Sequence, residues 1–172
     1  RWRTAWLILI STTMSSNERI LSFAVGNDQL ALILLVHRMV VHCESWRRVN
    51  AHPTMARSVL RTAIASYEPT ILACERPYGL CRKQGVNLKL LQTLVQAIMD
   101  EPIPHHLLNR QQPYRNRYEE AEALTERFPE MARWCPKQPH YPDTAPRSLV
   151  YFEALAYAVE VLDGTGGGRK GG

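Results

Sequence analysis

Two apolar runs joined by a tight turn constrain the fold of this 172-residue chain more than any other feature of its sequence. Residues 20–26 (ILSFAVG) end at Gly26-Asn27-Asp28, which is a typical turn sequence, and residues 30–36 (LALILLV) resume the apolar pattern. A third extended run follows at residues 38–43. Because the links between these runs are short, the sequence predicts three consecutive antiparallel strands.

The remainder of the chain alternates between helical and extended patterns. Apolar spacing predicts helices over residues 54–67, 88–98, 118–128 and 148–162, and strands over residues 70–74 and 103–108. Strand-helix-strand units favour parallel pairing through right-handed crossovers. We therefore predict an α/β fold with a mixed five-stranded sheet, in which three antiparallel strands are followed by parallel additions and helices cover both faces.

The ends of the chain depart from this pattern. We expect residues 1–18 to be an N-terminal extension, residues 19–163 to form one domain, and the glycine-rich residues 164–172 to be a flexible tail. The longest apolar runs fall short of the roughly 20 residues that cross a bilayer, so no membrane span is expected. Four cysteines without paired CxxC spacing favour reduced thiols in the cytoplasm.

Two glutamates lie at positions where a fold of this kind could carry catalytic or metal-binding groups. Glu75 follows the short strand at residues 70–74, so its carboxylate should be held at the carboxyl edge of the sheet. The simpler interpretation is a strand-ending charge paired with Arg76. Glu153 has apolar neighbours at helical spacing and should face the interior, where either a divalent cation or a buried arginine would compensate it.

Three motifs in order give the sequence a resemblance to RuvC-like Holliday junction resolvases of the ribonuclease H superfamily. They are ILSFAVGND, ACERPYGL with the following NLKLLQTL, and FEALAYAVEVL, which is similar to the closing Asp-Ala-Leu-Ala helix of the family. The resemblance covers most of residues 19–162, and the order of elements agrees with it. It implies a metal-dependent, structure-specific endonuclease of DNA recombination and repair that acts on branched DNA as a homodimer.

The resemblance also implies a two-metal site, with Mg²⁺ or Mn²⁺ held by carboxylates from the first strand, the fourth strand and the last helix. Glu75 matches the fourth-strand ligand, and Glu153 matches the helix ligand with Asp replaced by Glu. The first-strand position falls on Ala24, which offers no oxygen, and Val150 stands where a second helix carboxylate is common. Either the site is incomplete, by mutation or by descent, or a displaced carboxylate completes it. The candidates for that carboxylate are Asp28 and Asp143.

Basic and aromatic residues follow the fourth and fifth strands. The chain has a net charge of +5, and cations between aromatic rings can neutralise phosphates while the rings stack on unpaired bases. The simpler interpretation is a pair of solvated loops. The candidate nucleic-acid-binding residues are Arg76, Tyr78, Arg82, Lys83 and Lys89 in the region that follows Glu75, and Arg110, Tyr114, Arg115 and Arg117 in the loop after the fifth strand.

Two other hypotheses belong to different functional classes. Ala24 and Val150 fit a pseudo-nuclease that binds nucleic acid without cleaving it. A structural or interaction domain that neither binds nor cleaves nucleic acid is also consistent with the sequence. The chain further resembles the nuclease core of IS110-type transposases, in which Glu120 would stand near a catalytic aspartate. From the residues alone, Glu120 and its acidic neighbours Glu119, Glu122 and Glu126 are expected on the solvated face of an amphipathic helix.

Overall fold

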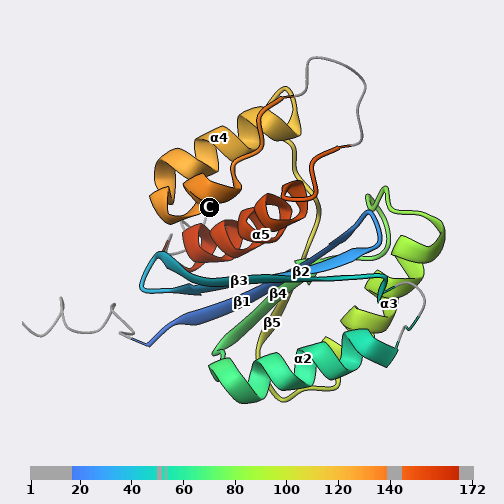
Figure 1. Ribbon diagram of the computed structural model, residues 1–172. Helices are drawn as coiled ribbons and strands as arrows, with labels where there is room; N and C mark the ends of the chain where they lie inside the picture. Colours follow the sequence, from blue (N-terminus) through green and yellow to red (C-terminus); the bar gives the residue numbers. More distant parts are fainter. Residues whose placement is uncertain (1–16, 50–51, 53, 139–144, 167–172) are drawn as a thin grey trace, which may run out of the picture.

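The computed structural model describes residues 17–49, 52, 54–138 and 145–166 (Figure 1). Strands and helices alternate along the chain as the sequence predicts. In order they are β1 (Arg19–Gly26), β2 (Gln29–Val36), β3 (Met39–Arg47), α2 (Thr54–Tyr67), β4 (Ile71–Glu75), α3 (Gly85–Met99), β5 (His105–Leu108), α4 (Arg117–Arg127), the 3₁₀ helix η2 (Pro129–Trp134) and α5 (Leu149–Gly166).

The five strands form one mixed sheet in the order β3-β2-β1-β4-β5. β1 pairs with β2, and β2 with β3, in antiparallel fashion, whereas β4 lies parallel to both β1 and β5. The β1–β2 turn places Asn27 and Asp28 at φ 50° and 60°, which is the left-handed geometry of a two-residue hairpin turn. The predicted meander with parallel additions is confirmed.

Helices cover both faces of the sheet, as predicted (Figure 1). On one face, α2 and α3 pack against Leu21, Phe23 and Val25 of β1. On the other face, α5 and α4 pack against Ile20 and Ala24, because successive side chains of a strand point to opposite sides. The central strands are therefore buried on both faces, which explains why β1 and β2 read as continuous apolar runs.

Several boundaries differ from the sequence-based prediction. β3 continues to Arg47 because its ladder with β2 extends to the pair Gln29 and Arg47. The 3₁₀ helix η2 was not predicted. α5 runs to Gly166 and so includes the first residues of the glycine-rich segment that was expected to be a tail, while residues 1–16 and 167–172 lie outside the described residues. No described helix has the length and hydropathy that a membrane crossing needs.

Candidate functional site

The sheet brings β1, β4 and α5 together on one face. Ser22 of β1 lies opposite Ala73 of β4, so the parallel register carries Ala24 to the position beside Glu75. The Ser22 hydroxyl donates a hydrogen bond of 2.7 Å to the carbonyl oxygen of Ala154, which holds α5 against β1. Glu153 is the residue before Ala154 in α5. The three positions at which the resemblance implies carboxylates, Ala24, Glu75 and Glu153, therefore lie on the same side of the sheet.

Lys83 connects the two glutamates. Its Nζ lies 3.0 Å from Glu75 Oε2 and 2.6 Å from Glu153 Oε1. Both glutamates are 2% exposed, so each carboxylate has lost most of its hydration. Glu75 Oε2 accepts no hydrogen bond from a described residue. Its contact with Lys83 is therefore an ion pair whose geometry is not that of a hydrogen bond. Lys83 comes from the segment between β4 and α3, which folds back over the sheet edge.

Glu153 has two further partners besides Lys83. Arg117 Nη2, from the first residue of α4, lies 2.6 Å from Glu153 Oε2. The Tyr157 hydroxyl, one turn further along α5, donates to Glu153 Oε1 at 3.2 Å. The centre thus contains two carboxylates and two cations, Lys83 and Arg117, and its formal charge is zero. Hereafter "the glutamate centre" means Glu75, Lys83, Arg117, Glu153 and Tyr157.

A second buried ion pair borders the glutamate centre. Arg110 donates through Nη1 and Nη2 to the two carboxylate oxygens of Glu120, at 2.8 and 2.5 Å, and its guanidinium lies 6.0 Å from the Tyr157 ring centroid. Glu120 is 3% exposed, so the expectation that it lies on a solvated helix face is wrong. The reason is that α4 packs on α5 with Glu120 and Ala121 turned inward.

The charges of the glutamate centre stabilise one another. Burial raises the pKa of the Glu153 carboxyl, but the Lys83 ammonium and the Arg117 and Arg110 guanidinium groups outweigh burial, so this pKa lies below its usual value. Burial likewise lowers the pKa of Lys83, but Glu153 and then Glu75 outweigh it, so this pKa is raised. Burial, followed by the Glu153 charge, raises the pKa of Tyr157, which therefore stays a neutral donor. At neutral pH, Glu153 and Lys83 are both charged.

These residues do not fit a divalent metal site as they stand. The Lys83 ammonium contacts both carboxylates, and Mg²⁺ needs oxygen ligands in near-octahedral array, which an ammonium cannot supply. Ala24 and Val150 add no oxygen, and in the described part of the chain no three His, Cys, Asp or Glu side chains lie close enough to share an ion. Asp28 lies in the β1–β2 turn, and Asp143 lies outside the described residues.

The predicted nucleic-acid-binding residues divide into two groups. Lys83, Arg110 and Arg117 use their charged groups to hold Glu75, Glu153 and Glu120, as described above. The other cations are exposed, namely Arg76 and Arg82 in the first loop, Lys89 on α3, and Arg115 in the second loop. Tyr78 is 60% exposed, with the Arg76 guanidinium 5.8 Å from its ring centroid, and Tyr114 is 38% exposed. A basic and aromatic surface therefore remains beside the neutral glutamate centre.

Sequence reasoning missed the partners of the glutamates. Tyr157 follows Glu153 by four residues, so helical spacing could have identified that contact. Lys83 follows Glu75 by eight residues in an irregular segment, where no periodicity indicates which way a side chain points. The Arg110–Glu120 pair depends on how α4 packs, which the sequence pattern of α4 did not indicate.

Comparison with known proteins gives structural similarity without sequence similarity. No protein-family profile matches the chain, and no curated protein matches its sequence. The structure is similar to Thermus thermophilus RuvC solved in complex with Holliday junction substrate, with a TM-score of 0.52 and 14% sequence identity over 86% of this chain and 97% of that one. A second structure of T. thermophilus RuvC gives the same TM-score and coverage at 13% identity. The chain therefore has the RuvC-like resolvase fold, a ribonuclease H-like α/β fold.

Proposed function

We propose that this chain binds branched DNA and that its glutamate centre is neutralised by Lys83 and Arg117 instead of by divalent metal, so that the chain does not cleave the DNA. The observation that carries the proposal is the position of Lys83 Nζ, 3.0 Å from Glu75 and 2.6 Å from Glu153. This function corresponds to the pseudo-nuclease hypothesis of the sequence analysis.

The surface beside the glutamate centre supports DNA binding. Exposed cations on two loops can neutralise phosphates, and the release of counterions then drives association. Tyr78 offers an exposed ring for stacking on an unpaired base, as does Tyr114 to a smaller extent. Leu80, in the same loop, is 72% exposed and adds an apolar contact beside Tyr78. Branch points can expose base pairs that lack a stacked neighbour, and the RuvC structure with the same fold was solved with a Holliday junction.

Charge balance and geometry support the absence of metal chemistry. A metal ion at the glutamate centre would have to displace the Lys83 ammonium, which would then lose both of its carboxylate partners in a buried position. No third carboxylate would compensate for the added positive charge, because Ala24 occupies the β1 position beside Glu75. Glu153 also keeps its contacts with Arg117 and Tyr157, which leaves little of its oxygen surface for a metal.

The test combines binding and cleavage of one labelled four-way DNA junction. The full chain is titrated against the junction with EDTA, with Mg²⁺ and with Mn²⁺, and the same mixtures are resolved on denaturing gels. We expect one dissociation constant in all three buffers at matched ionic strength, weakening steeply with salt, and no nicked strand. A linear duplex of the same length is the control for branch preference and should bind more weakly.

The variant Ala24→Asp separates this proposal from the nuclease hypothesis. A metal-dependent endonuclease is the second candidate. It is favoured by two buried carboxylates, Glu75 of β4 and Glu153 of α5, which lie close enough to contact the same cation, Lys83. If only a β1 ligand is missing, Ala24→Asp should nick the junction in Mg²⁺ or Mn²⁺. We expect Ala24→Asp to stay inactive because Lys83 still contacts both glutamates. Nicking by the wild type or by Ala24→Asp alone would contradict the proposal, and so would a failure of the wild type to bind the junction.

We further propose that the chain acts as a homodimer, because a four-way junction presents two equivalent strand pairs to a two-fold partner. Light scattering coupled to size exclusion, with and without the junction, measures this directly. A complex of two chains per junction is expected. The transposase alternative gains no support from Glu120, whose carboxylate is held by Arg110.

A further inference from the structure

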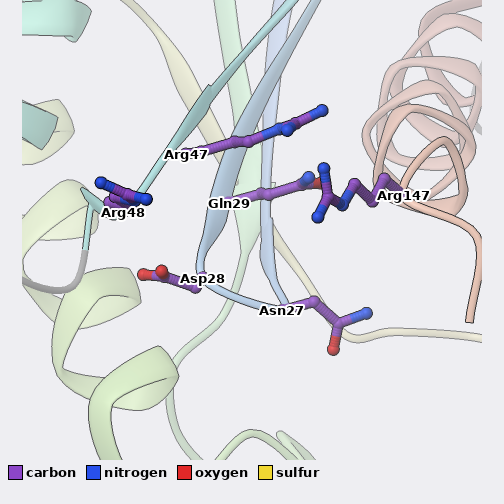
Figure 2. A pocket seen from close by; sticks show the side chains of 6 residues that line it. All are labelled: Asn27, Asp28, Gln29, Arg47, Arg48 and Arg147. Atoms are coloured by element: carbon purple, nitrogen blue, oxygen red, sulfur yellow. The ribbon is translucent and has the colours of Figure 1, made fainter. Parts of the chain in front are cut away.

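A polar pocket opens at the β1–β2 turn, separate from the residues of the glutamate centre. It has a volume of about 210 Å³ and is lined by Asn27, Asp28, Gln29, Arg47, Arg48 and Arg147. Figure 2 shows the Arg47, Gln29 and Arg147 side chains reaching toward the same space from β3, β2 and the segment before α5. The lining includes three arginines and one aspartate, so the pocket is positively charged. Hereafter it is called the arginine pocket.

The donors of the arginine pocket are not used elsewhere in the described structure. None of the three arginines forms an ion pair with a described residue. Gln29 is 4% exposed, and its side-chain amide makes no hydrogen bond to any residue that the structure describes, yet its polar atoms are not among the buried atoms that lack a partner. The Gln29 amide therefore stays open to the pocket that it lines and can donate to a polar ligand there.

The backbone that carries Gln29, Arg47 and Arg48 is held by hydrogen bonds. Gln29 and Arg47 are cross-strand partners in the β2–β3 ladder, and the Arg48 amide donates to the Asp28 carbonyl oxygen at 2.9 Å. Arg48 has a φ of +56°, a left-handed conformation that a residue with a side chain rarely adopts. Backbone strain of this kind concentrates at binding sites. Backbone hydrogen bonds therefore set where Gln29, Arg47 and Arg48 leave the chain.

We infer that the arginine pocket receives a phosphodiester group of the nucleic-acid backbone, an inference that rests on the proposed function. Guanidinium forks match the paired oxygens of a phosphate, and an amide donor completes the hydrogen bonding. The turn that lines the pocket follows β1, and β1 runs parallel to β4, so the pocket and Glu75 lie at the same edge of the sheet. One DNA strand lying along this edge would meet both.

The experiment removes two charges from the arginine pocket and two from the opposite face. The variant Arg47→Ala with Arg147→Ala is compared with the matched variant Arg57→Ala with Arg61→Ala, whose residues are exposed or half-buried on α2. The dissociation constant of the labelled four-way junction is measured from 50 to 300 mM NaCl. We expect the pocket variant to bind about tenfold more weakly and its salt slope to fall by about 1 to 2, whereas the α2 variant keeps the wild-type slope.

The outcomes separate this inference from the proposed function. If the wild type binds the junction and the two variants behave alike, the pocket does not receive a phosphodiester, and the proposed function stands. If the wild type does not bind, both ideas fail. A second arm titrates a fluorescent mononucleotide. Binding that the pocket variant loses, with unchanged junction affinity, would assign the pocket to a free nucleotide and overturn the inference. Circular dichroism of both variants confirms that they are folded.

Discussion

The two faces of the sheet differ in what they bury. Beneath α2 and α3, the buried side chains are apolar, from Leu21 and Phe23 in β1 to Leu91 and Leu94 in α3. Beneath α5 and α4, the sheet and helices bury polar groups as well. The buried polar residues of the described structure all lie on this side or at its edge, and they are Ser22, Gln29, Glu75, Glu120 and Glu153.

This difference shows how one sheet can separate stability from recognition. A purely apolar face needs only shape and volume to be stable, because burial of apolar surface is non-directional. Each buried charge on the other face needs a partner at the right distance, so that face depends on particular atoms of Lys83, Arg117 and Arg110. Variants on the first face should change stability alone. Variants on the second should also respond to charge and pH.

The largest effect is expected from Phe23→Ala on the apolar face. Phe23 is fully buried under α2 and α3, and its removal leaves a cavity that should cost about 4 kcal/mol of unfolding free energy. Urea denaturation measures the loss. The folded fraction should bind the four-way junction with the wild-type dissociation constant, and a weaker constant would show that the two faces are not independent.

A somewhat smaller loss of unfolding free energy is expected from Lys83→Met. Lys83 is the only cation among the described residues that contacts Glu75, so its removal leaves a buried carboxylate without compensation, at a cost of about 3 kcal/mol. Adding Glu75→Gln removes that uncompensated charge and should recover most of the stability. A double-mutant cycle from urea denaturation gives the coupling. Additive effects of the two substitutions would contradict the bridging role of Lys83.

Glu153→Gln should produce a pH-dependent difference. The folded protein lowers the pKa of Glu153 below its ordinary value of 4.5, so the ionised carboxylate adds stability at higher pH. That contribution is complete above about pH 4.5 and is lost as the pH falls through the lower folded pKa. We expect wild type to exceed Glu153→Gln by about 2 kcal/mol at pH 7 and the gap to close in acid. Thermal melts between pH 2.5 and 7 measure it, and a gap that is constant with pH would refute the ion-pair account.

The smallest effect is expected from Ser22→Ala. The Ser22 hydroxyl makes a buried hydrogen bond to the Ala154 carbonyl, and its loss should cost about 1 kcal/mol. Thr93→Ala is a matched control, because the Thr93 hydroxyl also donates to a helix carbonyl, that of Lys89, but in an exposed position. Thr93→Ala should lose almost no free energy of unfolding in the same urea series. Equal losses would mean that burial does not distinguish the two bonds.

Much of the fold was predictable because it depends on local patterns. The apolar runs of β1 and β2, the turn at Asn27 and Asp28, and the helical spacing of α2 each determine their own structure over a few residues. The short strand β4 and its final Glu75 were also identified this way. The end of β3 was placed too early, because residues 44–47 become a strand only through their pairing with β2.

The candidate site was predictable only in its carboxylates. Glu75 and Glu153 could be identified because each stands beside an apolar pattern. Glu153 is buried as expected, and Glu75, which was expected at the carboxyl edge of the sheet, is buried as well. Lys83 and Arg117 were expected to contact nucleic acid, since a cation in a loop or at a helix start carries no sign of its partner. The arginine pocket was not predicted at all, because Arg47 and Arg147 are separated by 100 positions in the chain.

By itself, the sequence determined the succession of strands and helices, the place of Glu75 at the end of a strand and the inward direction of Glu153, because hydrophobic periodicity acts over distances that neighbouring residues span. Only the tertiary structure decided which charges compensate those glutamates. An ion pair depends on separations of a few ångströms between residues far apart in the chain, and the packing of α4, α5 and the β4–α3 segment sets those separations. The same packing decides that Lys83 faces Glu75, whereas the lack of a β1 carboxylate at this place follows from the sequence, which has Ala24 there.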